Sequence, residues 1–133
     1  MENNIKRIRD QTVEEFTRVE ELCSMVSFFF SKLYNIETFK EKSKYFVISK
    51  QLVFYALQRS LGRIEPTEKN LDCLLSLNVI NRDFLDRLLE IKKKLQYLET
   101  LYYKNRIKEV VDQLLVIGKD IDRMKTEFKS QLE

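Results

Sequence analysis

The chain has 133 residues, of which 44% are hydrophobic and 34% are charged, and it contains two glycines, one proline and a net charge of +3. This length and balance are typical of one helical domain with its own core, and they exclude a sheet protein and a disordered chain. The apolar runs are far shorter than the ~20 residues of a membrane span, and the N-terminus has no apolar signal region. We therefore expect a single all-α domain over residues 1–133, located in the cytoplasm and not in a membrane.

The chemical inventory is narrow because the chain contains no histidine. A histidine base, a Ser-His or Cys-His nucleophile and histidine metal ligands are therefore excluded. Cys23 and Cys73 form no CxxC pair, so no zinc site is indicated, and we expect neither a metal nor a cofactor. Both cysteines lie on apolar helical faces, which predicts two buried, reduced, structural thiols.

The first helix is predicted to begin at Thr12, where Thr12 and Glu15 have the spacing of a capping box. Apolar residues recur at helical spacing from there to Leu33, and the helix should end near Tyr34-Asn35. The three consecutive residues Phe28–Phe30 span more than half of the helix circumference. One of them is expected to leave the core face, where it would meet a partner or be partly covered by the second helix.

The second helix is predicted from positions 35–38 to about Ile64. Thr38 and Glu41 again have capping-box spacing, and the stretch 45–61 is apolar on more than one side. Gly62 and Pro66 are expected to close this helix.

Three more helices are predicted after this point. Thr67 is expected to cap a short extra helix at about 67–77, and a turn follows at 78–81. Two long helices then carry apolar residues at alternating steps of four and three, with a break predicted only by Lys104-Asn105. The expected fold is an up-and-down four-helix bundle with one short extra helix. The two seams are Phe84, Leu88, Ile91, Leu95, Leu98 and Tyr102, then Val110, Leu114, Ile117, Ile121, Met124 and Phe128.

Charge is unevenly distributed along the chain. Residues 40–63 carry six lysines and arginines against Glu41 alone, residues 82–108 carry eight against four acids, and residues 10–34 have an excess of three acids. Two basic helices could form one surface that attracts nucleic acid, or they could be solvated faces of ordinary helices. Charge alone favours the second interpretation.

The stretch from Leu71 to Tyr102 resembles the HEPN superfamily, and within it the HepT-like toxins of toxin–antitoxin pairs. The features that carry the resemblance are an acidic first helix, a long apolar second helix over 46–61, and the segment Leu71–Ile80, which ends in Val-Ile. The resemblance covers most of the chain and implies a HEPN-like bundle.

The family's functional motif is almost entirely replaced in this chain. Aligned without a gap from Ile80, the family motif would read Arg-Asn, three further residues, His, one further residue and Tyr. The positions of its Arg, Asn, His and Tyr hold Leu95, Gln96, Thr100 and Tyr102 in this chain. The resemblance implies that the histidine would move a proton in RNA cleavage and that the arginine would hold the phosphate. Leucine and threonine can do neither near neutral pH, so we expect no catalytic residue and no ribonuclease activity of the family type.

Two hypotheses of different classes follow, with a carboxylate- and lysine-dependent enzyme as a distant third. The first is a non-catalytic HEPN-like homodimer that binds RNA, a nucleotide or a nucleotidyltransferase-type antitoxin partner. The second is a helical-bundle protein–protein interaction module with no nucleic-acid role, which Phe28–Phe30 favours. The tyrosine at position 102 matches a nucleotide acceptor described in some family members, although a seam tyrosine more often packs in a core. Candidate phosphate contacts are Lys92, Lys93, Lys94, Lys104 and Arg106.

Overall fold

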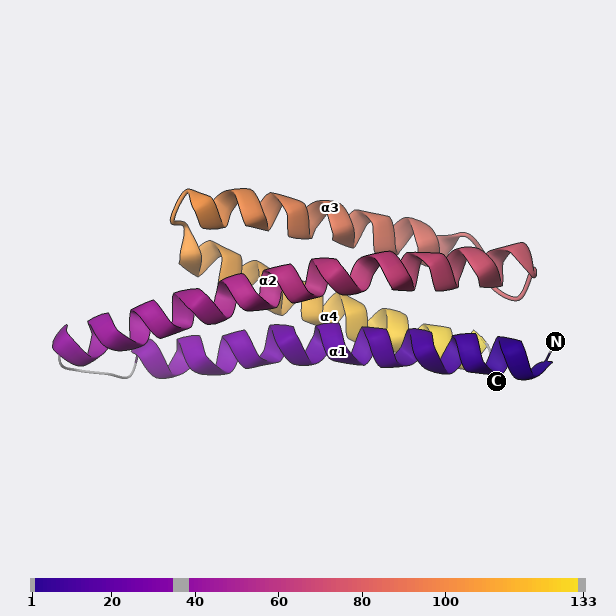
Figure 1. The fold of residues 1–133 in the computed structure, drawn as a ribbon, viewed down its shortest axis with the longest axis horizontal. Helices are drawn as coiled ribbons and strands as arrows, with labels where there is room; N and C mark the ends of the chain where they lie inside the picture. The colour runs from indigo at the N-terminus through magenta and orange to yellow at the C-terminus, as the bar shows by residue number, and fades with distance from the viewer. Residues whose placement is uncertain (1, 35–38, 132–133) are drawn as a thin grey trace.

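The computed structural model of the chain is a bundle of four helices, α1 (Glu2–Tyr34), α2 (Phe39–Ser76), α3 (Asp83–Tyr103) and α4 (Ile107–Gln131) (Figure 1). It describes the backbone of residues 2–34 and 39–131, and the side chains of residues 3–26, 28, 47 and 50–131. No strand occurs in these residues. The prediction of an all-α up-and-down bundle is therefore confirmed.

Each helix packs against its two neighbours in a ring, because α1 contacts α2 and α4, and α3 also contacts α2 and α4. Consecutive helices run in opposite directions, so both chain ends lie at the same end of the bundle (Figure 1). At the other end, α2 reaches past the turn between α3 and α4. This is the up-and-down topology that short connections produce.

The predicted end of the first helix and the two later turns are confirmed. α1 ends at Tyr34, and both predicted turns are present, with Asn78 at φ 58° and Asn105 at φ 63°. Asparagine tolerates this left-handed backbone better than most residues, which explains why the chain turns at these two points. The backbone N–H of Asp83 also donates to the Asn81 side chain at 3.1 Å, which satisfies a free amide at the start of α3.

The prediction that α1 begins at Thr12 is wrong, because α1 begins ten residues earlier. The Thr12 side chain is fully buried, and its hydroxyl donates to the Ile8 carbonyl at 2.7 Å within the helix. Ile5 and Ile8 extend the apolar stripe upstream and pack against the core. Their burial favours a continuous helix over a local cap.

The short extra helix at 67–77 is not a separate element, because α2 continues through Pro66 to Ser76. Gly62 and Pro66 are exposed, so the hydrogen bond that proline cannot donate is lost on the solvated side of the helix. The Thr67 hydroxyl donates to the Arg63 carbonyl at 2.6 Å, so Thr67 is not a cap. Core contacts on both sides of Pro66 hold the helix together, through Ile64, Leu71 and Leu74. The proposed cap at Thr38 lies outside the described residues.

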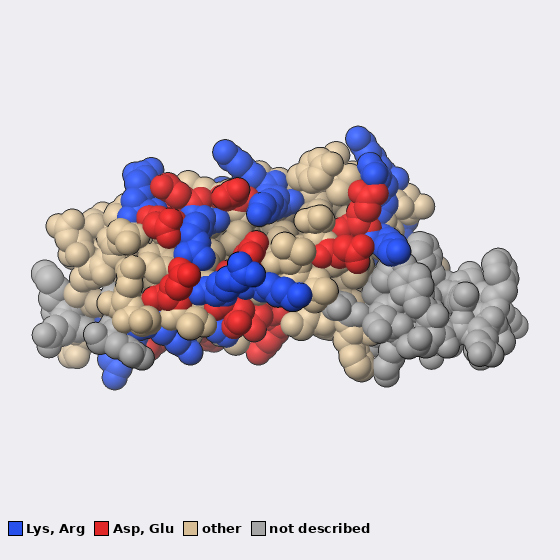
Figure 2. Space-filling model, turned by 180° about the vertical axis from the view of Figure 1, so that it is seen from behind, with Lys and Arg blue, Asp and Glu red and all other residues tan. Residues whose placement is uncertain are grey.

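The outward faces of the helices carry the charged residues, and on the side opposite to Figure 1 acidic and basic side chains are interspersed (Figure 2). Several ion pairs join neighbouring helices. Lys125 approaches Glu20 of α1 at 2.7 Å, and Lys94 of α3 approaches Asp120 of α4 at 3.9 Å. A surface of such mixed sign has no strong attraction for a polyanion.

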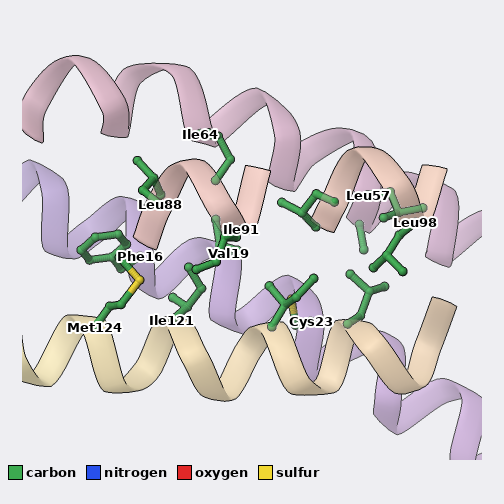
Figure 3. Close-up of a cluster of buried hydrophobic side chains, with 14 of the residues drawn as sticks. Phe16, Val19, Cys23, Leu57, Ile64, Leu88, Ile91, Leu98, Ile121 and Met124 are labelled. Atoms are coloured by element: carbon green, nitrogen blue, oxygen red, sulfur yellow. The ribbon is translucent and has the colours of Figure 1, made fainter. Parts of the chain in front are cut away.

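All four helices contribute to the core, where Phe16, Leu57, Leu88 and Ile121 point towards the same central space (Figure 3). Both predicted seams are buried, except that Tyr102 is half-buried. Where α1 and α4 meet, a methyl group added at Gly118 would lie 3.1 Å from the Cβ of Cys23, so a small residue is needed for this close approach. The core is thus the one that the apolar spacing predicted.

The two cysteines differ in their environment, so the prediction of two buried thiols holds for Cys23 and is wrong for Cys73, which is exposed. Burial, with a smaller contribution from Glu20, raises the pKa of Cys23 to about 12. Cys73 lies near the end of α2 on a side that no other helix covers, although Leu71, Leu74 and Leu75 close to it in sequence are apolar.

We expect one thiol per chain to react quickly with a chromogenic disulfide reagent at pH 8. Cys73 is accessible, whereas Cys23 is both covered and ionised to only about one part in ten thousand at that pH. Full denaturation should release the second thiol. Cys73→Ser should abolish the rapid phase and Cys23→Ser should leave it intact; two rapid thiols in the native wild type would contradict the structure.

Candidate nucleic-acid interface

The four motif-equivalent positions do not share one environment. Leu95 is fully buried in the core, whereas Gln96 and Thr100 are exposed on α3 and Tyr102 is half-buried. Helical geometry explains the difference, because Leu95 belongs to the apolar seam and Thr100 is rotated to the outer side. The position that would hold the family arginine therefore faces the bundle interior in this chain.

Tyr102 packs between α3 and α2. Its hydroxyl donates to the Lys50 carbonyl at 3.3 Å, and its ring lies 5.4 Å from the ring of Phe54 between centroids. Burial, and secondarily the neighbouring Tyr103, raises the pKa of the Tyr102 hydroxyl. A tyrosine held in this way joins two helices and is a poor nucleophile at neutral pH.

Lys50 and Asn105 connect α2 to the turn between α3 and α4. The Lys50 Nζ donates to Asn105 Oδ1 at 2.9 Å and lies 5.8 Å from the centre of the Tyr102 ring. The ring of Tyr103 approaches that of Phe54 at 6.5 Å. These contacts bring aromatic and basic groups from two helices to the same end of the bundle, next to the turn.

Three of the five candidate cations are paired with carboxylates. Lys92 approaches Glu68 of α2 at 3.6 Å, Lys94 approaches Asp120 of α4 at 3.9 Å, and Arg106 donates to Glu109 at 2.9 Å. The consecutive lysines therefore point to different sides of α3, because successive helical residues are about 100° apart. The candidate cations do not form one cluster.

The other two candidates, Lys93 and Lys104, have no ion pair within the part of the chain that the structure describes. Both are exposed, and they lie on the same side of α3, opposite its buried seam. Between them lie the two most exposed large hydrophobic side chains of the described residues, Tyr97 at 61% and Tyr103 at 69%. We call this surface the α3 outer face, and it consists of Lys93, Tyr97, Thr100, Tyr103 and Lys104.

The α3 outer face is poor in acidic groups. Among residues 91–108 there are six lysines and arginines and a single acid, Glu99. The carboxylate of Glu99 accepts a hydrogen bond from Gln58 of α2 at 2.6 Å, which directs it away from the outer side. This face offers unpaired cations beside exposed aromatic rings, the combination that single-stranded nucleic acid needs.

Sequence reasoning missed four residues of this region: Tyr97, Tyr103, Lys50 and Phe54. The spacing of Lys93, Tyr97, Thr100 and Lys104, in steps of four, three and four, was a detectable signal, since it repeats the period of the buried seam on the opposite side. Lys50 and Phe54 carried no such signal. They reach the turn only through the packing of α2 on α3.

Other kinds of site receive no support in the described residues. No group of three or more cysteine, aspartate and glutamate side chains there could hold a metal ion. None of the described helices combines the length and the apolar character that crossing a bilayer requires.

Comparison with known proteins returned no relative: no protein-family model, no curated protein and no solved structure matches the chain.

Proposed function

We propose that this protein is a non-catalytic HEPN-like binding module that holds single-stranded RNA on the α3 outer face. The observation that supports this proposal is the pair of exposed rings, Tyr97 and Tyr103, flanked by the unpaired Lys93 and Lys104. The homodimer and the nucleotidyltransferase-type partner belong to the same proposal and rest on the resemblance of the Leu71–Tyr102 stretch alone.

The geometry fits a short single strand. Lys93 and Lys104 are eleven residues apart on one helix, so their Cα atoms are separated by roughly 16 Å along the axis. That distance spans a few nucleotides, with phosphates near the two ammonium groups and unpaired bases stacked on the rings. Stacking on an aromatic side chain contributes about 1–3 kcal/mol per base and tolerates any base. A mononucleotide would use one ring only and bind more weakly.

The proposal is non-catalytic because the groups needed for cleavage are missing. Leu95 stands in the core and Thr100 cannot accept a proton near neutral pH. Tyr102, the one motif residue that survives, donates its hydroxyl hydrogen to a backbone carbonyl. Binding without cleavage is therefore the expected outcome with RNA.

Alanine at Tyr97 or Tyr103 is expected to weaken binding of a ten-nucleotide single-stranded RNA by about five- to 150-fold each, because each change removes one stacking platform. Fluorescence anisotropy with labelled RNA at low salt measures the effect. Tyr55→Ala is the matched control, since Tyr55 is 46% exposed on α2 and packs against Arg59 away from this face. Equal losses in all three variants, or none, would argue against the α3 outer face.

The lysines give a second readout of the same site. Changing Lys93 and Lys104 together to glutamine should reduce the slope of log affinity against log salt by about 1.4, since each neutralised phosphate contributes roughly 0.7 for a single strand. Lys129→Gln on α4 is the matched control, being exposed and distant in sequence. The RNA should be recovered intact after incubation without metal; cleaved RNA would refute the non-catalytic part of the proposal.

The alternative function is a helical-bundle interaction module with no nucleic-acid role. The exposure of Phe28 at 57% and Val47 at 54% favours it, because both are apolar, one in the last two turns of α1 and the other in the third turn of α2. Failure of the wild-type protein to bind any RNA at low salt would leave this alternative in place of the first.

A further inference from the structure

A groove of about 400 Å³ runs between the outer sides of α1 and α2. Its apolar part consists of Leu22 and Met25 from α1 and Tyr55 from α2, of which Tyr55 is 46% exposed. The charged residues along the groove are Arg18, Glu21, Arg59 and Arg63.

Two of these charges are already satisfied within the chain, and two are not. Arg18 pairs with Glu14 at 2.6 Å, and Arg63 pairs with Glu15 at 3.2 Å. Within the described residues, Glu21 and Arg59 form no ion pair, and Arg59 only lies over the Tyr55 ring at 5.3 Å from its centre. The groove therefore presents one unpaired anion on α1 and one unpaired cation on α2.

The register of the two helices places these groups at matching heights. The Arg63–Glu15 ion pair shows which residues of antiparallel α1 and α2 lie level with each other, and the groove continues along both helices from there. In antiparallel helices, residues that lie level have nearly the same sum of residue numbers; this sum is 78 for Arg63 and Glu15 and 80 for Glu21 and Arg59. If a second copy is rotated by 180° about an axis parallel to the helices, each residue keeps its position along that axis. Such a rotation can place α1 against the partner's α2.

We propose that two copies of this chain pair through this groove about a two-fold axis parallel to α1 and α2. Glu21 then lies opposite the partner's Arg59, and Met25 lies opposite the partner's Tyr55. Symmetry forms each contact twice, as in any closed two-fold interface. The occupant is a second copy because the two unpaired charges of the groove complement each other across the two-fold axis: Glu21 on α1 is an anion and Arg59 on α2 is a cation.

This dimer is independent of the proposed RNA-binding function. α1 and α3 do not contact each other, so they occupy opposite corners of the bundle, and a copy seated on α1 and α2 leaves the α3 outer face open. It also differs from the arrangement that the family resemblance implies, in which the motif regions on α3 of two copies face each other. The two arrangements are separated by variants on different helices.

A charge-reversal cycle tests the proposal, with the dissociation constant of the dimer measured by sedimentation equilibrium and the fold checked by circular dichroism. Glu21→Arg and Arg59→Glu should each raise that constant at least about tenfold, because each single change creates two like-charge contacts across the interface. The double variant, which restores opposite charges with their places exchanged, should recover most of the affinity. Tyr97→Asp on the α3 outer face is the control and should leave it unchanged.

The contrary outcomes are distinct. A wild-type protein that stays monomeric at about 100 μM would overturn the dimer, and single variants with unchanged affinity would overturn this interface. A double variant that fails to recover would overturn the pairing of Glu21 with the partner's Arg59. Dissociation caused by Tyr97→Asp alone would instead place the interface on α3.

Discussion

Replacing Phe128 with alanine is expected to lower the free energy of unfolding by about 3–5 kcal/mol. The Phe128 side chain is fully buried, and its ring meets those of Phe16 and Phe84 edge to face, at 5.9 Å and 5.7 Å between centroids. The change would leave a cavity between α1, α3 and α4 and remove both ring contacts. Urea unfolding followed by circular dichroism at 222 nm measures the loss.

Phe28→Ala provides the matched control, because it deletes the same atoms from a side chain that is 57% exposed. Its expected cost is below about 1 kcal/mol, since a surface substitution leaves no cavity. Similar costs for the two variants would mean that Phe128 does not lie at the junction of three helices. That result would question the packing of α4 more than that of any other helix.

Replacing Leu95 with arginine, the residue that the family motif would place there, is expected to destabilise the fold by about 3–5 kcal/mol or to prevent folding. The side chain of Leu95 is fully buried in the α3 seam, whose buried members are all apolar. An unpaired charge in such a place loses its hydration without compensation. The midpoint of thermal unfolding would fall accordingly.

The neighbouring position gives the control for this prediction. Gln96→Arg adds the same side chain one residue further along an exposed surface and should change stability by no more than about 0.5 kcal/mol. Thr100→His should likewise be tolerated, because Thr100 is exposed. If Leu95→Arg melts at the wild-type temperature, then position 95 faces solvent and the family site could be rebuilt.

Positions 95 and 100 differ in environment, so we do not expect that restoring the motif residues implied by the resemblance would bring them together. A histidine at position 100 would stand on the outer side of α3, whereas an arginine at position 95 would have to leave the core to reach it. In this chain, position 95 contributes to packing between the helices. The non-catalytic proposal therefore has a structural basis beyond the absence of histidine.

Local signals predicted some features wrongly where burial opposed them. The capping box at Thr12 and the breakers Gly62 and Pro66 each indicated a helix end, yet the helix continues at all three. A cap is worth about 1 kcal/mol, and burial of one large apolar side chain contributes about 1.5–3 kcal/mol. Ile5 and Ile8 upstream of Thr12, and Leu71 and Leu74 downstream of Pro66, together outweigh the local preference.

What the sequence alone determined is the set of apolar seams and therefore the bundle. The steps of four and three from Phe84 to Leu98 and from Val110 to Phe128 coincide with buried side chains throughout. Residues at this spacing lie on one side of a helix, and an apolar side is buried against the core. The turns at Asn78 and Asn105 were also visible, since few residues tolerate their backbone conformation.

Only the tertiary structure decided which polar and aromatic groups are available for binding. Lys92, Lys93 and Lys94 are alike in sequence, and the carboxylates of Glu68 and Asp120 on neighbouring helices leave Lys93 alone unpaired. Cys73 is exposed because no helix covers its side of α2, and Lys50 reaches Asn105 across fifty-five residues. Such outcomes depend on distances between helices, which a one-dimensional pattern of residue types does not contain.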